Sequence, residues 1–125
     1  MKVGDSVEVT RAFNMQDLQD YAGLSDHVAM GNDIPEPLIG ALFSYLLGVK
    51  LPGLGTHYLK QETRFHYRVK PGEVLTARVE VTRLRPDKQL TDLATRCYLA
   101  NGRLVADGRA LVYVGDLLMK PEHEL

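Results

Sequence analysis

One segment of the chain restricts its possible folds more than any other: PLIGALFSYLLG, residues 37–48. In a helix built from this segment, apolar side chains cover nearly the whole circumference rather than a single stripe. Those side chains are Leu38, Ile39, Ala41, Leu42, Phe43, Tyr45, Leu46 and Leu47. Pro37 suits the first turn of such a helix, and Gly48 suits its C-terminal end. Because a helix that is apolar all round has to be surrounded by protein, we expect the rest of the chain to enclose it.

The residues after this helix have the period-two pattern of antiparallel strands. In residues 73–84, apolar side chains at every second position share one face and polar side chains share the other. Further strands are expected at 58–69, 93–99 and 104–114. Residues 70–73 should form a turn, and Asn101-Gly102 predicts a type I′ hairpin. One buried helix and several long antiparallel strands predict an α+β fold, the hot-dog arrangement, in which an antiparallel sheet curls around a central helix.

The N-terminal residues predict one more strand and a short helix. Apolar and polar residues alternate in SVEVT, residues 6–10, which indicates a strand. Asn14 and Asp17 are suitable capping residues for a helix that ends near Ala22. No internal repeat or linker divides the sequence, so we expect residues 1–125 to form one domain.

Composition argues against several classes of function. The 15 Lys and Arg residues nearly balance the 16 Asp and Glu residues, and no basic block is interleaved with aromatic residues, so we expect no binding of nucleic acid. No apolar run approaches about 18 residues and the N-terminus lacks a signal pattern, so we expect neither membrane insertion nor export. The one cysteine, Cys97, is expected to pack in the core and fits a reducing compartment. We therefore expect a cytoplasmic protein.

Four segments carry a resemblance to a known family. They are VGDSVEVTRAF at 3–13, DLQDYAGLS at 17–25, ALFSYLLGVKLPGLGTHYLKQETRF at 41–65 and VKPGEVLTARVEVTRLRPDK at 69–88. Together they cover most of the chain, which resembles the MaoC-like (R)-specific enoyl-CoA hydratase family. The resemblance implies a homodimer whose sheets join edge to edge, with acyl-thioester sites at the interface. It also implies an acyl-CoA or acyl carrier protein thioester as the substrate, and no separate cofactor.

The resemblance further implies a reaction. Family members add water across the 2,3 double bond of an enoyl thioester, or remove it, with an Asp and a His in a D-x-N-P-x-H segment. The chemistry is general acid-base catalysis on water, by groups whose pKa values lie near the operating pH. A helix N-terminus then stabilises the negative charge that develops on the thioester oxygen.

The segment SDHVAMGNDIPEP, residues 25–37, departs from that motif. In an alignment without gaps, His27 takes the place of the family Asp and Asn32 takes the place of its His. A shift by one residue brings Asp26 to the place of the Asp but leaves a glycine in the place of the His. Relatives also carry a lobe that ends in His-Gly before the central helix, whereas here Pro35 and Glu36 occupy those positions.

Several residues are candidates for the reaction. His27 is the candidate base, because an imidazole titrates near neutral pH and Asp26 can hold its tautomer, although a solvated loop pair is the alternative. Asn32 can hold water or a thioester oxygen, or can serve only as a turn residue. Ser44 matches a serine that the family carries near the site on the central helix. A bond from its hydroxyl back to the helix backbone would satisfy it equally well.

Other candidates point to hydrolysis or to anion binding. Glu36, and Asp33 as a second choice, can activate water as a carboxylate does in related hot-dog thioesterases. Arg83, Arg85 and Lys88 end one strand and can bind a CoA phosphate, or form an ordinary solvated turn. No group of His, Cys or carboxylate residues has the spacing of metal ligands.

Three hypotheses follow for the function. The first is reversible hydration of a 2-enoyl thioester by a lyase of the hydratase or dehydratase type. The second is hydrolysis of an acyl-CoA thioester. The third is a non-catalytic dimer that binds acyl-CoA.

Overall fold

The computed structural model describes residues 1–25, 33–53 and 57–114, with the side chains of 22–25 left aside. The strands are β1 (Ser6–Ala12), β2 (His57–Phe65), β3 (Val74–Arg85), β4 (Leu90–Leu99) and β5 (Leu104–Tyr113). The helices are α1 (Met15–Ser25) and α2 (Glu36–Tyr45), and a π-helical turn (Leu46–Lys50) continues α2. A short 3-10 turn (Pro86–Lys88) joins β3 to β4.

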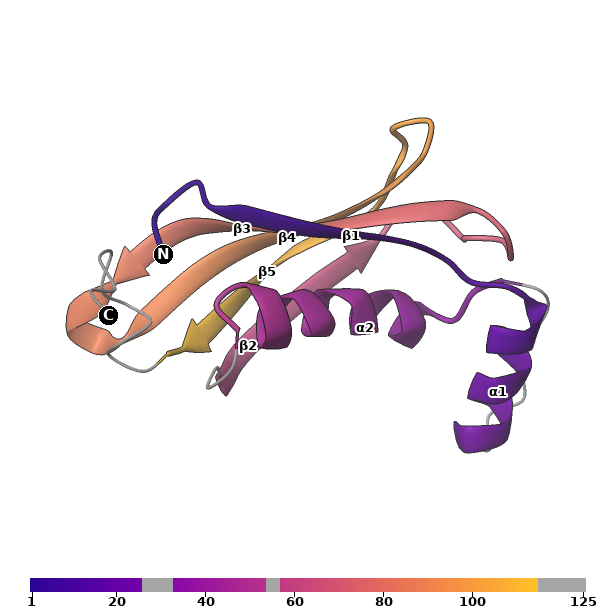
Figure 1. The fold of residues 1–125 in the computed structure, drawn as a ribbon, viewed down its shortest axis with the longest axis horizontal. Coiled ribbons are helices and arrows are strands. Elements are labelled where there is room, and N and C mark those ends of the chain that lie inside the picture. Colours follow the sequence, from indigo (N-terminus) through magenta and orange to yellow (C-terminus); the bar gives the residue numbers. More distant parts are fainter. Residues whose placement is uncertain (26–32, 54–56, 115–125) are drawn as a thin grey trace.

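The five strands form one antiparallel sheet in the order β1-β3-β4-β5-β2, and α2 lies along one face of it (Figure 1). The predicted α+β arrangement of a sheet around a central helix is therefore confirmed. Strand β2 follows α2 in the sequence but pairs with β5, the last strand. It consequently stands at one edge of the sheet, and β1 stands at the other.

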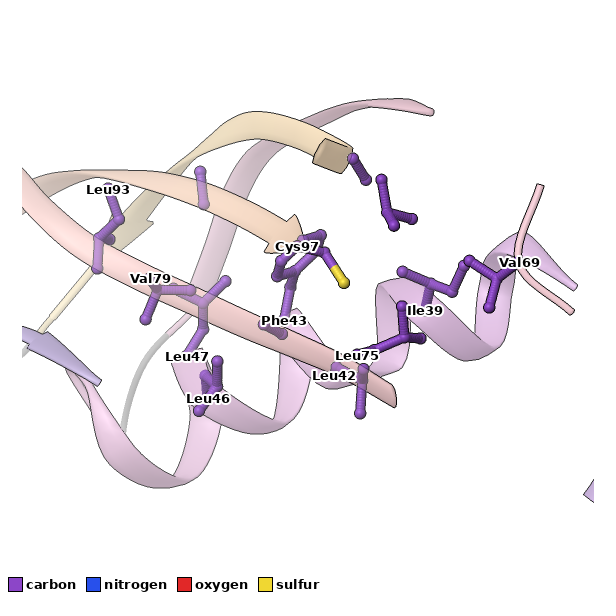
Figure 2. Packing of buried hydrophobic residues seen from close by; sticks show 14 of the residues in the cluster. Ile39, Leu42, Phe43, Leu46, Leu47, Val69, Leu75, Val79, Leu93 and Cys97 are labelled. Carbon is purple, nitrogen blue, oxygen red and sulfur yellow. The ribbon is translucent and has the colours of Figure 1, made fainter. Parts of the chain in front are cut away.

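The core lies between α2 and the sheet (Figure 2). Phe43, Leu46 and Leu47 of the helical segment are fully buried, as are the alternate side chains that β3 and β4 turn toward it. Those strand residues are Leu75, Ala77, Val79, Val81, Leu93 and Cys97. Each large side chain of this set contributes roughly 1.5–3 kcal/mol through removal of its apolar surface from water. The apolar side chains recur at every second residue along the strands and at every third or fourth residue along the helix. These two sets of side chains therefore pack against each other in one interface.

The described sheet covers only one side of α2. Ile39, Leu42 and Phe43 are buried, but Ala41 and Tyr45 are exposed. The exposed fraction of Tyr45 is 44%. The expectation that the helix is enclosed on every side is therefore not met by the described residues, although the helix is the central one of the predicted fold. A single curved sheet meets only one face of a helix, so the apolar residues on the other face remain uncovered by the described part of this chain.

The two predicted turns form, but one has a different type. Gly102 has a φ of 88°, whereas Asn101 does not have a positive φ, so the hairpin is not type I′. Instead the N–H of Gly102 donates to the carbonyl of Leu99 at 2.9 Å, and the N–H of Leu99 donates to Arg103 at 2.9 Å. This pattern is a type I turn followed by a left-handed glycine. At residues 70–73, Gly72 also has a positive φ, which together with the preceding Pro71 indicates a type II turn.

Helix α1 begins at the predicted cap. The N–H of Asp17 donates to the side-chain oxygen of Asn14 at 2.9 Å, and the N–H of Asn14 donates to the Asp17 carboxylate at 2.8 Å. Phe13 and Leu18, one on each side of the cap, are both buried. This is a reciprocal capping box with a hydrophobic staple. The helix continues to Ser25, three residues beyond the predicted end.

The cap gives a prediction about stability. We expect Asn14→Ala to lower the free energy of unfolding by about 1 kcal/mol, because the N–H of Asp17 loses its acceptor. Urea denaturation followed by circular dichroism measures this change. Gln16→Ala, at an exposed position in the first turn of the same helix, is the control and should change the value by less than about 0.5 kcal/mol. Equal effects of the two substitutions would contradict a specific capping role.

Candidate functional site

A groove of about 430 Å³ lies between α2 and the edge strand β2. Its walls are Glu36, Pro37 and Gly40 from the first turns of α2, and Gln61, Thr63 and Phe65 from β2. Alternate residues of a strand point to the same face, so the three β2 residues form one wall. Residues one turn apart on a helix also share a face, so Glu36 and Gly40 form the other. The groove therefore carries one large apolar side chain, Phe65, and has polar groups on both walls.

Two features of α2 shape this groove. Gly40 has no side chain to fill the groove, and the space beside it is open, since a Cβ built there would meet no atom within 4 Å among the described residues. The helix also begins at this end, with Pro35 in the capping position and the Glu36 carboxylate in the first turn. The N-terminus of a helix carries a partial positive charge, which favours a carboxylate or another negatively charged oxygen beside it. The groove thus combines space for an apolar chain with an end suited to negative charge.

Farther along α2, Ser44 lies against β2. The hydroxyl of Tyr58 donates a hydrogen bond of 2.9 Å to the backbone carbonyl of Ser44. Burial raises the pKa of the Tyr58 hydroxyl, against a smaller lowering by its bond to Ser44, so the group stays protonated at neutral pH. A Cβ at Gly48 would lie 3.4 Å from the same hydroxyl, in ordinary contact. Tyr58 therefore fastens the edge strand to the end of α2, one turn beyond the groove.

Only some of the predicted acid-base residues belong to the part of the chain that the structure describes. Asp26, His27 and Asn32 lie outside the described residues. Glu36 lines the groove, and Ser44 follows Gly40 by one helical turn.

The second candidate carboxylate, Asp33, does not line the groove. It forms an ion pair with Lys70 and approaches Arg68 at 3.9 Å. Asp33 is therefore engaged in joining the segment before α2 to the segment after β2. Of the two carboxylates considered for hydrolysis, Glu36 is the one that the structure places beside a cavity.

Two polar residues of the groove, Gln61 and Thr63, were not among the sequence candidates. The signal that could have found them is the alternation along β2, which puts Gln61, Thr63 and Phe65 on the face turned toward α2. The bulge at residues 58–60 interrupts that alternation, so the residues before it cannot be assigned to a face without the pairing of β2 with β5.

The predicted anion-binding residues lie on the other face of the sheet. Arg83 and Arg85 line a hollow of about 220 Å³ together with Thr82, Asp92 and Arg109. Nη2 of Arg85 donates to Oδ2 of Asp92 at 2.7 Å. Lys88 is exposed in the short 3-10 turn and does not line the hollow. The structure thus brings together two of the three predicted residues and adds Arg109 from β5.

Two other side chains with potential reactivity, His66 and Cys97, have a structural explanation. His66 Nε2 and Asp107 Oδ1 are 2.8 Å apart, and both side chains are partly exposed. Burial raises the pKa of the Cys97 thiol to about 11, so this thiol stays protonated and the prediction that it packs in the core is confirmed. Within residues 1–25, 33–53 and 57–114, no group of three His, Cys, Asp or Glu residues could hold a metal ion. In the same residues no helix has the length and apolarity needed to cross a membrane.

Comparison with known proteins identifies the family. No family model matches the chain. An (R)-specific enoyl-CoA hydratase from Aeromonas caviae is 35% identical over 126 residues, which span 90% of this chain and 94% of that protein. An (R)-specific enoyl-CoA hydratase from Rhodospirillum rubrum is 33% identical over 128 residues, which span 91% of this chain and 88% of that protein.

A solved structure agrees with these sequence matches. The (R)-hydratase from A. caviae involved in PHA biosynthesis superposes with a TM-score of 0.86 and 32% sequence identity, over 92% of this chain and 98% of that one. The agreement in sequence and in fold extends over nearly the full length of both proteins. The chain belongs to the (R)-specific enoyl-CoA hydratase family.

Proposed function

We propose that the protein reversibly adds water to a 2-enoyl thioester of CoA or of acyl carrier protein and forms the 3-hydroxyacyl thioester. The observation that carries this proposal is the 35% identity, over nearly the full length, to a protein named for (R)-specific enoyl-CoA hydration. The groove between α2 and β2 supports it, because an apolar side chain, Phe65, and the N-terminal turn of a helix both line the groove.

In this proposal each of these residues has a separate role in binding or in proton transfer. The acyl chain lies in the groove over Gly40 and along the β2 wall, and the thioester oxygen faces the start of α2. His27 takes a proton from water, whose oxygen bonds to C3 of the enoyl group while C2 receives a proton. Asp26 holds the tautomer of His27, and Asn32 positions the water.

Ser44 has a supporting part in this scheme. Its carbonyl accepts the Tyr58 hydrogen bond, so it fixes the distance between α2 and the strand that forms the opposite wall. No group other than the CoA or carrier-protein part of the substrate is needed for the proposed reaction.

One observation favours hydrolysis of the thioester as a second candidate. The Glu36 carboxylate lines the groove together with Gln61 and Thr63, and a carboxylate there can activate water for attack on the thioester carbonyl. In that reaction the C–S bond breaks, the acyl group leaves as a carboxylic acid, and free CoA thiol is released.

One assay distinguishes these activities. The protein is incubated with crotonyl-CoA and separately with 3-hydroxybutyryl-CoA, and both the enoyl absorbance and the free thiol are followed. Hydration predicts loss of absorbance from the first substrate, a gain from the second, and no thiol. Hydrolysis predicts thiol release. Binding of acyl-CoA with neither change would overturn both enzymatic proposals and leave a binding protein.

We also propose that the protein is a homodimer joined through β2. This strand stands at the edge of the described sheet and is exposed along most of its length. Large apolar side chains are exposed beside it: Tyr58 and Leu59 at 44% and 57% on β2, and Tyr45 and Val49 at 44% and 54% on the helical segment. An unpaired edge strand flanked by apolar surface is suited to pairing with another strand. A second copy would also cover the exposed side of α2.

A substitution at a surface residue tests the proposed dimer interface. We expect Leu59→Lys to shift the protein from dimer to monomer at micromolar concentration in sedimentation velocity, because it introduces a charge beside the pairing edge. Val3→Lys is the matched control, since Val3 is similarly exposed, at 62%, but precedes β1 at the opposite edge. The control should remain dimeric. A monomeric wild-type protein would contradict the proposed assembly outright.

The location of the protein belongs to the same proposal. A reducing compartment suits its single buried cysteine, and acyl-CoA is a soluble substrate, so we propose the cytoplasm as its site of action.

A further inference from the structure

The outer face of the sheet, which is turned away from α2, carries two hollows that share one arginine. The Arg83 hollow, already described, contains Arg83, Arg85 and Arg109, and has a volume of about 220 Å³. The Arg96 hollow has a volume of about 290 Å³ and contains Arg64, Arg96 and Arg109. Arg109 of β5 stands between them, and its neighbour on β4 is Ala94, whose small side chain leaves the floor low.

The two hollows have an excess of positive charge. They contain five arginines and three carboxylates, Glu62, Asp92 and Asp107, whereas the chain as a whole has a formal charge of −1. These carboxylates already have close cationic or histidine partners. Lys60 is 3.0 Å from Glu62, Arg85 is 2.7 Å from Asp92, and His66 is 2.8 Å from Asp107.

The remaining arginines form no close ion pair. Within the part of the chain that the structure describes, Arg64, Arg83 and Arg96 have no carboxylate within 4 Å, and Arg109 reaches Glu62 only at 3.9 Å. In the sheet register Asp107 lies opposite both Arg64 and Arg96, and Asp92 lies opposite Arg83. These carboxylates offset part of the repulsion among the arginines, and the excess of positive charge in the two hollows remains.

One buried donor adds an independent observation. Nε of Arg85 is buried and has no hydrogen-bond acceptor among the described residues, although Nη2 of the same guanidinium is bonded to Asp92. A buried N–H without an acceptor is unfavourable, and such groups normally bind an ion or water. Arg85 itself lines the Arg83 hollow, beside the guanidiniums of Arg83 and Arg109.

We propose that this outer face binds a phosphate-bearing ligand, with one phosphate in the Arg83 hollow and a second group in the Arg96 hollow. Guanidinium groups present parallel N–H donors that match the oxygens of a phosphate, and Arg109 can contact an anion on either side of it. The ligand is either the nucleotide part of a CoA thioester or a separate phosphorylated molecule. The site lies on the opposite face of the sheet from the groove and does not depend on the proposed reaction.

The test is a direct binding measurement on the full chain. Isothermal titration with pyrophosphate, adenosine 3′,5′-bisphosphate and CoA, at low salt, should show saturable binding, and adenosine should show none. Binding should weaken as salt is raised, because the arginines are partly exposed. Arg109→Gln should weaken binding on the order of 10-fold or more, since one charge-assisted contact to each hollow is lost. Arg83→Gln should do the same for the bisphosphate.

The control is Arg78→Gln. Arg78 is on the same face, but it is paired with Glu80 at 3.0 Å and lines neither hollow, so its loss should leave affinity unchanged. Absence of saturable phosphate binding would overturn the proposal. So would equal weakening by Arg78→Gln and Arg109→Gln, because that result indicates only a general attraction to positive charge.

Acyl-pantetheine, which lacks the nucleotide, separates the two sources of phosphate. If Arg109→Gln weakens binding of acyl-CoA but not of acyl-pantetheine, the site holds the substrate's own nucleotide. If both thioesters bind as before while bisphosphate binding is lost, the ligand is a separate molecule. These readouts are affinities and remain valid in the absence of hydratase or thioesterase activity.

Discussion

Replacing Gly108 by alanine is expected to lower the free energy of unfolding by about 3 kcal/mol or more. Gly108 lies in β5, opposite Thr95 of β4 and Thr63 of β2. A Cβ at this position would overlap the carbonyl oxygen of Glu62 and would lie 2.8 Å from its carbonyl carbon and 2.9 Å from Cα of Thr63. These are backbone atoms of a paired strand, so no side-chain rotation can relieve the overlap.

The only response left is displacement of β2 from β5. Overpacking usually costs about 1–3 kcal/mol where side chains can adjust, and a clash with backbone lies at or above that range. For a chain of this length, about 3 kcal/mol corresponds to a fall in melting temperature of roughly 10 °C or more. Urea denaturation and calorimetry measure the two quantities.

The same substitution at Gly40 is the matched control. Gly40 is inside α2, and a Cβ there meets no atom within 4 Å in the described residues. Because alanine is the better helix former by roughly 1 kcal/mol, Gly40→Ala should leave the stability unchanged or raise it. A small effect of Gly108→Ala would mean that β2 is free to move away from β5. That mobility would also undermine the groove, because Gln61 and Thr63 are on this strand.

Most of the fold could be predicted because its signals are local. The alternation in residues 73–84 identified β3 and its buried face, and the reciprocal bonds of Asn14 and Asp17 follow from a recognisable capping pattern. The type of the hairpin at Asn101-Gly102 could not be predicted in the same way. Several turns accept these two residues, and the backbone of the flanking strands selects among them.

Less of the site could be predicted, because its groups meet across long sequence distances. Glu36 and Gln61 are brought to one groove by the pairing of β2 with β5, which no local pattern specifies. Arg109 joins Arg83 and Arg85 through the pairing of β5 with β4 and of β4 with β3, whose register includes a bulge between Val81 and Arg83. The exposed side of α2 illustrates a different limit. The all-round apolar pattern indicates that the helix is covered on every side, but not whether this chain or a second copy provides the cover.

The second large effect concerns catalysis. If the protein is a hydratase, His27→Ala is expected to lower turnover of crotonyl-CoA by roughly 10²- to 10⁴-fold, the usual contribution of a positioned acid-base group. The argument is chemical. An unperturbed imidazole has a pKa of about 6.5 and so accepts a proton from water at neutral pH better than the carboxylates of the neighbouring segment. Steady-state hydration kinetics measure the effect, and sedimentation checks that the variant keeps its assembly.

Glu36→Gln is the paired variant, and the two substitutions give opposite results under the two proposed reactions. Glutamine keeps the size and position of the side chain in the groove but cannot take up a proton. Under hydration by His27, Glu36→Gln should leave turnover nearly unchanged, whereas under thioester hydrolysis it should abolish most of the thiol release. Full hydratase activity in His27→Ala would show that the base is misassigned even though the family is correct. The next candidate would then be Glu36, the one described carboxylate that lines the groove.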